Sequence, residues 1–103
     1  MKILQIAHSF PPESMTGSEI YAYNLSLSLL KNHAVSIFYR IDNPEQEEYE
    51  VIKDNYNGLI VYKINNTLKY YHSLEKIYDN KDIENKFLVV LKEVAPDIIH
   101  IHH

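Results

Sequence analysis

The chain has 103 residues, enough for one domain with an apolar core and too few for two domains of ordinary size. Its hydrophobic content of 46% and charged content of 23% are those of a globular protein, not of a disordered or fibrous one. The net charge of −4, with ten Lys and Arg residues scattered along the chain, argues against a nucleic-acid partner. The absence of Cys excludes disulfides and thiolate metal sites.

The sequence also bears on the compartment. The N-terminal stretch lacks the features of a signal peptide, and no apolar run approaches the roughly 20 residues that a bilayer-spanning helix needs. We therefore expect a cytoplasmic chain that is neither exported nor inserted. A peripheral membrane location of a longer, full-length protein stays open, although no segment shows a Lys-rich amphipathic face.

The first predicted element is a strand over residues 2–7. This stretch is continuously apolar rather than alternating, as is typical of a strand that is buried on both faces of a parallel sheet. Pro11 and Pro12 follow, and they cannot donate the hydrogen bonds of a sheet. The strand must therefore end by about Phe10.

A helix is predicted to follow, because Thr16 and Glu19 have the spacing of a capping box. The face expected to pack against the sheet consists of Ile20, Tyr23, Leu27 and Leu30, widened by Leu25 and Leu29. The helix is expected to run to about Lys31. Asn32 is a plausible C-terminal cap, because Asn tolerates the left-handed backbone conformation.

A second strand is predicted at residues 35–39. The strand, helix and strand together form a βαβ unit, and such crossovers are nearly always right-handed and join parallel strands. The polar acidic stretch 42–48 is interpreted as a solvated loop.

A hairpin is predicted next, with arms at residues 49–55 and 59–64. Asn57-Gly58 lies between these β-prone segments, and this dipeptide is the strongest short-range signal for a tight hairpin turn. A helix beginning in the first arm remains an alternative, because its alternation is imperfect.

The last third of the chain contains two clear elements. A helix is predicted from Asp82, a plausible N-cap, to Ala95, where Pro96 ends it, and a final strand over residues 98–102. The apolar positions of this helix that recur at helical spacing are Ile83, Phe87, Leu91 and Val94, with Leu88 and Val90 beside them. Before it, residues 68–78 are compatible with a short helix.

These elements predict an α/β domain: a parallel sheet of order 3-2-1-4, with helices on both faces and an added hairpin. In this order the last strand lies at an edge. We therefore expect residues 97–102 to present an exposed strand that is open to pairing with a second copy of the chain.

The functional expectation centres on the carboxyl ends of the parallel strands, where ligands bind in open α/β sheets. Gly17 lies in the first turn of the first helix, whose free N–H groups attract anions. His8 and His102 are expected at the same edge of the sheet. The purely structural interpretation is an ordinary capped helix start and a polar strand end. No metal site is assigned to His100, His102 and His103, because no carboxylate or Cys neighbours them.

Several segments, in their order and spacing, resemble the N-terminal half of glycosyltransferase family 4, the group 1 glycosyltransferases. They are Met1-Lys2-Ile3-Leu4, Phe10-Pro11-Pro12, Thr16-Gly17-Ser18-Glu19, Lys31-Asn32-His33-Ala34-Val35 and Pro96-Asp97-Ile98-Ile99-His100-Ile101-His102. Two positions depart from the family pattern, in that Thr16 and Asn32 stand where glycines are usual. A loop that needs a positive φ at Thr16 would be strained.

The resemblance implies a GT-B enzyme, with two Rossmann-like domains that transfer a sugar from a nucleotide-sugar donor to an acceptor glycan or lipid with retention of configuration. Residues 1–103 would be the single N-terminal, acceptor-side domain. The donor-binding domain would lie outside this chain, so the chain alone is expected to be inactive. The nucleotide sugar is a substrate, and no cofactor is expected.

The resemblance also implies roles for individual residues. Gly17 and Thr16 would face the donor diphosphate, and His102 would contact the transferred sugar. The residues expected to line the cleft are His8, Pro12 and Glu19. The alternative is a free-standing α/β module that binds a ligand or a protein without catalysis, because a fold does not by itself determine a function.

Overall fold

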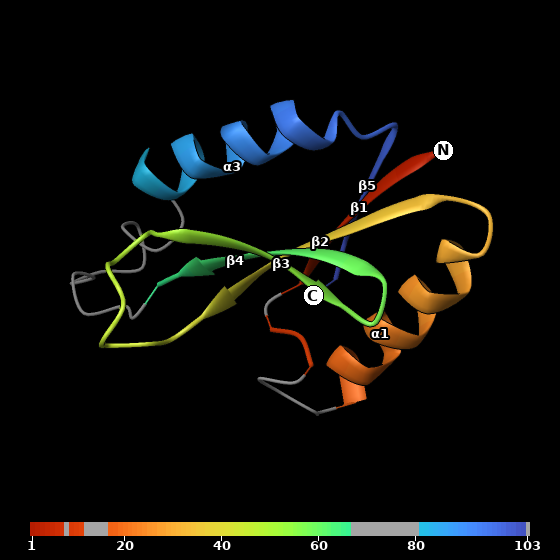
Figure 1. The fold of residues 1–103 in the computed structure, drawn as a ribbon, viewed down its shortest axis with the longest axis horizontal. Helices are drawn as coiled ribbons and strands as arrows, with labels where there is room; N and C mark the ends of the chain where they lie inside the picture. The colour runs from red at the N-terminus through yellow and green to blue at the C-terminus, as the bar shows by residue number, and fades with distance from the viewer. Residues whose placement is uncertain (8, 12–16, 67–80, 103) are drawn as a thin grey trace.

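The computed structural model describes residues 1–7, 9–11, 17–66 and 81–102. These residues form one mixed sheet and two helices, and the chain is an α/β domain as expected (Figure 1). In chain order the elements are β1 (Lys2–Ala7), α1 (Gly17–Leu30), β2 (Ala34–Ile41), β3 (Val51–Tyr56), β4 (Leu59–Asn65), α3 (Lys81–Val94) and β5 (Ile98–Ile101). The short helix suggested over 68–78 lies outside the described residues.

The sheet has the order β3-β4-β2-β1-β5, which differs from the expected 3-2-1-4 order. The sheet is mixed, because β3 pairs with β4, the other arm of the expected hairpin, in the antiparallel direction. β4 then pairs with β2 in parallel, so the third strand of the chain is pushed to the outer edge. The remaining neighbours, β2 with β1 and β1 with β5, are parallel.

The hairpin between β3 and β4 is confirmed, and its turn explains the antiparallel pair. Tyr56 and Leu59 are paired across a two-residue loop. The loop residues Asn57 and Gly58 both have positive φ, 52° and 92°. Positive φ at both positions defines a type I′ turn, whose twist matches that of the flanking strands.

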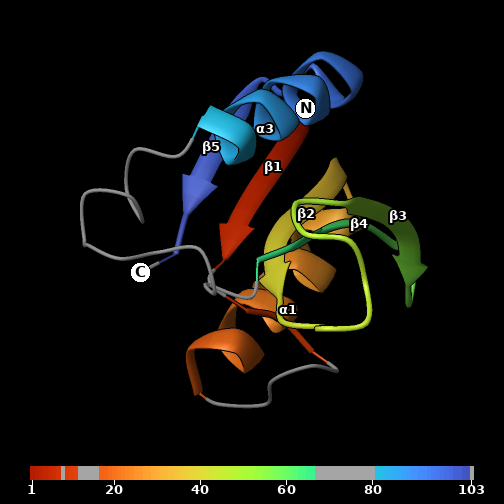
Figure 2. The ribbon, with the colours of Figure 1, turned by 90° about the vertical axis from the view of Figure 1, so that its left-hand side faces the viewer.

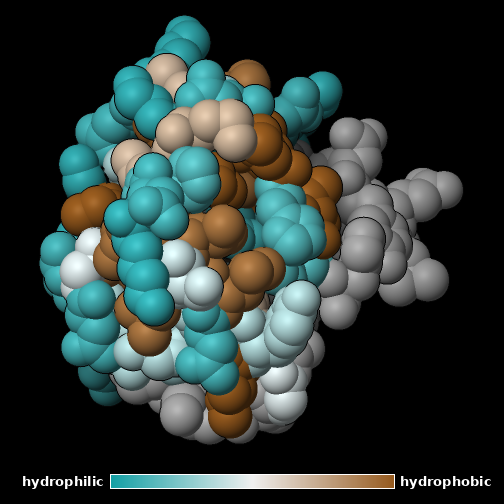
Figure 3. Space-filling model, turned by 90° about the vertical axis from the view of Figure 1, so that its right-hand side faces the viewer, coloured by the Kyte–Doolittle hydropathy of each residue, from teal (hydrophilic) through white to brown (hydrophobic). Residues whose placement is uncertain are grey.

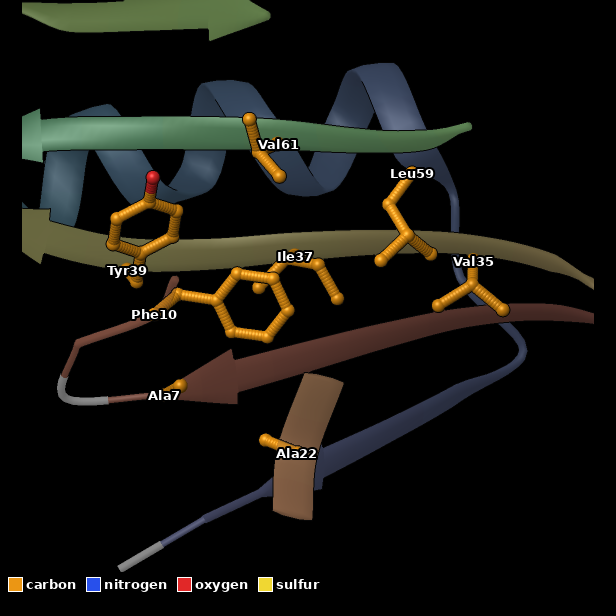
Figure 4. Close-up of a cluster of buried hydrophobic side chains, with 8 residues drawn as sticks. All are labelled: Ala7, Phe10, Ala22, Val35, Ile37, Tyr39, Leu59 and Val61. Atoms are coloured by element: carbon orange, nitrogen blue, oxygen red, sulfur yellow. The ribbon is translucent and has the colours of Figure 1, made fainter. Parts of the chain in front are cut away.

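The two helices cover opposite faces of the sheet, as expected (Figure 2). On one face, α3 packs through Phe87, Val90 and Leu91 against Leu4 and Phe38. On the other face, α1 covers a cluster of side chains that point toward one another and come from β1, β2, β4, the loop after β1 and α1 itself (Figure 4). Its members are Ala7, Phe10, Ala22, Val35, Ile37, Tyr39, Leu59 and Val61.

The expected face of α1 packs against the sheet through Tyr23, Leu27, Leu29 and Leu30. Two further residues on α1, and one of the expected ones, differ from the prediction. Ala22 and Ser26 are fully buried, whereas Ile20 is exposed. Ala22 and Ser26 are small and one turn apart, so they let the helix approach the sheet closely. The Ser26 hydroxyl is satisfied by donating to the carbonyl of Ala22 at 2.7 Å. The spacing pattern thus identified the apolar side of α1, but not the small residues at its closest approach to the sheet.

The helix ends also differ from the sequence expectation in one case. Asn32 does not adopt positive φ, and α1 instead ends with backbone bonds from Asn32 and His33 to the carbonyl of Leu29. α3 ends as predicted before Pro96, with Ala95 in the left-handed region at φ 47°. The Ala95 N–H donates to the carbonyl of Leu91.

A hydrogen bond also connects α3 to the sheet, beside the apolar contacts of Phe87, Val90 and Leu91. The Tyr62 hydroxyl on β4 donates a hydrogen bond to Glu93 on α3. Burial of the ring, together with the neighbouring carboxylate, raises the pKa of Tyr62 to about 12. The phenol therefore stays neutral and keeps donating to Glu93 at physiological pH.

β5 occupies the sheet edge opposite β3, and Ile98, Ile99 and Ile101 on it are exposed. Figure 3 shows the face of the molecule at the amino ends of the parallel strands, where apolar residues lie among polar ones. Neither helix in the described part of the chain combines the length and apolarity that a bilayer crossing requires.

Candidate functional site

The sheet has a topological switch point at β1. From β1 the chain goes to β2 on one side, and its last strand, β5, lies on the other side. In open α/β sheets, ligands bind at the carboxyl ends of the strands at such a point. Figure 2 shows β1 and β5 side by side with their arrowheads in the same direction. The candidate site therefore lies where β1 and β5 end and α1 begins.

A buried amide and an imidazole meet at this point. Gln5 lies in the middle of β1 with its side chain fully buried, and its register partner on β5 is His100. His102, two residues further on, lies with its Nε2 2.6 Å from Oε1 of Gln5. In this arrangement Nε2 carries the hydrogen and donates it, which leaves Nδ1 of His102 as an acceptor.

The state of His102 follows from its surroundings. Partial burial, and then the neighbouring His100, lower the pKa of His102 below its usual value of 6.5. The ring centroids of the two histidines are 4.3 Å apart. His102 is therefore a neutral imidazole at physiological pH, able to accept a hydrogen bond from a hydroxyl group.

The first helix reaches the same place through Tyr21. The ring of Tyr21 lies edge-on to that of His102, with centroids 6.3 Å apart. Tyr21 is one helical turn after Gly17, the first residue of α1. The contact thus brings the N-terminal part of α1 next to the end of β5, although Tyr21 and His102 are 81 residues apart in the chain.

Gly17 itself is not required by packing. It is exposed, its φ is not in the left-handed region, and a Cβ added to it would meet no heavy atom within 4 Å. A glycine in a helix normally costs stability relative to alanine, by up to about 1 kcal/mol. The open space beside Gly17 leaves its backbone accessible to a ligand.

Glu19 lies in the first turn of α1 and is half-buried. A carboxylate in this position interacts favourably with the N-terminal end of the helix dipole. Three of the sequence-predicted site residues, Gly17, Glu19 and His102, can thus be located. The other three, His8, Pro12 and Thr16, lie outside the described residues.

Sequence reasoning missed Gln5 and Tyr21. The signal for Gln5 was present, because it is the one amide within the apolar run of residues 2–7. Its Nε2 is buried and has no hydrogen-bond partner among the described residues. A buried N–H group without a partner costs about 1–3 kcal/mol, more than the net value of the single hydrogen bond that Oε1 accepts from His102.

Replacing Gln5 with leucine should raise the free energy of unfolding by up to about 1 kcal/mol, because the cost of the unpaired buried N–H group exceeds the net value of the hydrogen bond from half-buried His102 that is lost with it. Urea unfolding of the two proteins measures the difference. Ser26→Ala is the matched control, since Ser26 is equally buried but its hydroxyl already donates a hydrogen bond to the carbonyl of Ala22. This variant should gain less stability than Gln5→Leu. A loss of stability in Gln5→Leu would show that the amide is structurally required.

Metal ligands do not assemble here: among the described residues, no group of three His, Cys, Asp or Glu side chains is placed to hold a metal ion. Comparison of the chain with protein-family models, with curated proteins and with solved structures gave no match.

Proposed function

We propose that this chain is a Rossmann-like, acceptor-side domain of a retaining GT-B glycosyltransferase, which transfers a sugar from a nucleotide-sugar donor to an acceptor glycan or lipid. The observation that carries the proposal is the meeting of two distant segments. The segment that begins α1 and the segment that ends β5 both carry the resemblance to glycosyltransferase family 4, and Tyr21 contacts His102 between them.

The first segment suits the donor diphosphate. The first N–H groups of a helix have no partner within the helix, and together with the helix dipole they favour an anion. Gly17 offers these groups without a side chain in the way, since the space beside its Cα is open. This explains why a residue that weakens a helix is found at the start of α1.

The second segment suits a sugar hydroxyl. His102 is neutral, its Nε2 is held by Gln5, and its Nδ1 is left to accept a hydrogen bond. Gln5 is fixed in β1, between β2 and β5, so it sets the orientation of the imidazole ring. In retaining transfer the donor sugar must be held in one orientation while its bond to the diphosphate breaks. We infer that His102 contributes to this positioning.

The test uses the complete protein that contains this chain, assayed with a panel of nucleotide sugars and acceptors. Release of the nucleoside diphosphate measures turnover, and NMR of the product gives the anomeric configuration. We expect transfer with retention. His102→Ala should lower kcat/KM by about 10- to 100-fold, the effect of losing one or two well-placed hydrogen bonds.

Two further variants separate chemistry from folding. His33→Ala is the matched histidine control, because His33 contacts the N-terminal amine and lies at the other end of the parallel strands. It should leave turnover unchanged. Gly17→Ala should fold normally, since the added Cβ meets nothing, yet bind the donor more weakly. Inverted product, no turnover with any donor, or full activity of His102→Ala would each contradict the proposal.

A further inference from the structure

A second site lies away from His102, where β1 and β2 end. A pocket of about 480 Å³ is lined there by Ser9, Arg40, Ile41, Asp42 and Asn43. The volume is within the range of small-molecule sites, about 300–1,000 Å³. The polar lining combines one cation, one carboxylate, one hydroxyl and one amide at the carboxyl edge of a sheet, where ligands of α/β proteins are usually bound.

Arg40 is the single arginine of the chain, and its place on β2 explains how it reaches the pocket. The last register pair of β1 and β2 is Ala7 with Tyr39, so Arg40 lies one residue beyond the end of β1. Phe38, the preceding residue on the same side of β2, is buried, but the side chain of Arg40 is 25% exposed. The guanidinium is thus partly shielded from water without being sealed off.

The guanidinium is held in place by the backbone. Nε of Arg40 donates to the carbonyl of Asn66 at 2.8 Å, and Asn66 is buried. Asn66 is fixed in turn, because its N–H donates to the carbonyl of Ile41. With Nε engaged, the four N–H groups on the two terminal nitrogens remain for other partners. A guanidinium fixed in this way loses little freedom when it binds an anion.

The terminal N–H groups of Arg40 interact only weakly with Asp42. Nη2 of Arg40 lies 3.6 Å from the carboxylate of Asp42, whose side chain is 57% exposed. This separation is longer than a hydrogen bond, and exposed ion pairs contribute little to stability. An anion with a higher charge than a carboxylate can therefore displace Asp42 from Arg40.

We propose that this pocket binds the phosphoryl group of a small, soluble phosphomonoester, with the Arg40 guanidinium as its main ligand. A phosphomonoester carries close to two negative charges at neutral pH and matches the fork of a guanidinium, so it competes better than a single carboxylate. The loop after β2 carries Glu45, Glu47 and Glu48, which disfavour loose attraction of anions. Binding then depends on direct contact with Arg40.

The inference does not depend on the proposed glycosyltransferase function, because it is tested without donor or acceptor. The isotope-labelled chain is titrated with glycerol 3-phosphate, inorganic phosphate and acetate while the backbone N–H signals of Ser9 and Asn43 are followed by NMR. We expect saturable shifts with glycerol 3-phosphate, weaker ones with inorganic phosphate and none with acetate. Equal responses to acetate would overturn the proposal.

Variants identify the ligand group. Arg40→Gln should raise the Kd for glycerol 3-phosphate at least about tenfold, and Arg40→Lys should have an intermediate effect, because it keeps the charge and loses the fork. Asp42→Asn removes the competing carboxylate and should lower the Kd by about threefold. Lys81→Gln is the matched control, since it removes a positive charge from the exposed start of α3, and it should bind normally.

The outcomes are decisive even if Arg40→Gln fails to fold, because Arg40→Lys and Asp42→Asn make opposite predictions. Unchanged affinity in all three variants would overturn the assignment to Arg40. A final arm uses phosphatidylcholine vesicles that contain phosphatidic acid. Arg40-dependent binding to these vesicles, with none to glycerol 3-phosphate, would assign the pocket to a lipid headgroup and overturn the soluble source.

Discussion

Replacing Phe10 with alanine should lower the free energy of unfolding by about 3–5 kcal/mol, the usual cost of deleting a buried aromatic ring. Phe10 is fully buried. Its ring lies edge-on to that of Tyr23 on α1, at 5.9 Å between centroids, and 5.5 Å from that of Tyr39 on β2. In Figure 4 the ring lies beside Ile37 and Tyr39, in the middle of the cluster under α1. Its loss would leave a cavity between helix and sheet.

Urea unfolding measures this effect, and Phe10→Leu is the matched control. Leucine keeps most of the apolar volume, so we expect this variant to lose less than half as much stability. A domain of this size has about 5–15 kcal/mol of stability in total, and Phe10→Ala would remove a large part of it. A loss below about 1 kcal/mol would mean that the surroundings of Phe10 are not packed as the structure shows.

Phe10 also helps to position the candidate functional site at the start of α1. Phe10 lies three residues after the end of β1 at Ala7 and is buried against both Tyr23 of α1 and Tyr39 of β2. The side chain therefore ties the chain that leaves β1 to the helix whose first turn lies at the candidate site. A single aromatic residue in this position fixes the distance between the end of β1 and α1.

Helices, strands and turns could be predicted wherever a single local feature of the sequence determines them. The continuous apolar run predicts β1 because a strand covered on both faces has no polar side. Asn57 and Gly58 predict the hairpin because few other residues adopt two successive positive φ angles. Pro96 predicts the end of α3 for an equally local reason, since proline cannot continue a helix.

The arrangement of these elements was less predictable, because it depends on competition between partners. The hairpin could have been added outside the parallel strands, yet β4 pairs with β2 and leaves β3 at the edge. Similarly, the spacing of α1 predicts the packing of Tyr23, Leu27 and Leu30 against the sheet, but not that the small residues Ala22 and Ser26 are the ones fully buried. Neither result follows from spacing alone.

The candidate sites divide in the same way. His102 and Gly17 were expected because the resemblance pointed to them, and the structure describes both. Arg40 was not expected, since a charged residue near the end of a strand is an ordinary feature of sequences. Its significance comes from the carbonyl of Asn66, 26 residues away, which holds the guanidinium at the pocket. Such a partnership is visible only in three dimensions.

Replacing Asn65 with alanine should cost about 2–4 kcal/mol, because several hydrogen bonds of a fully buried side chain are lost together. Nδ2 of Asn65 donates to the carbonyls of Asn43, Gln46 and Glu47 at 2.9, 3.0 and 3.1 Å. Oδ1 accepts from the N–H of Asn43 at 2.9 Å. One side chain at the end of β4 thus holds most of the loop that follows β2.

Two variants test whether these bonds, rather than volume, are responsible. Asn65→Asp preserves the shape but turns a carboxylate toward three carbonyl oxygens, so near neutral pH it should be at least as destabilising as the alanine variant. Burial and the facing carbonyls would raise the pKa of the new carboxyl group, so its deficit should shrink as the pH falls from that raised pKa toward about 4, where the unfolded chain is protonated as well. Asn24→Ala, an exposed change on α1, should alter stability by less than about 0.5 kcal/mol.

The same variants separate the loop from the anion site. Asn43 lines the pocket beside Arg40, and Asn65 fixes Asn43 through both of its backbone groups. Asn65→Ala should therefore weaken the binding of glycerol 3-phosphate even under conditions where the protein is fully folded. The guanidinium bond to Asn66 would remain, so the loss should be smaller than that of Arg40→Gln. If the two variants lost the same affinity, the loop rather than the charge of Arg40 would determine binding.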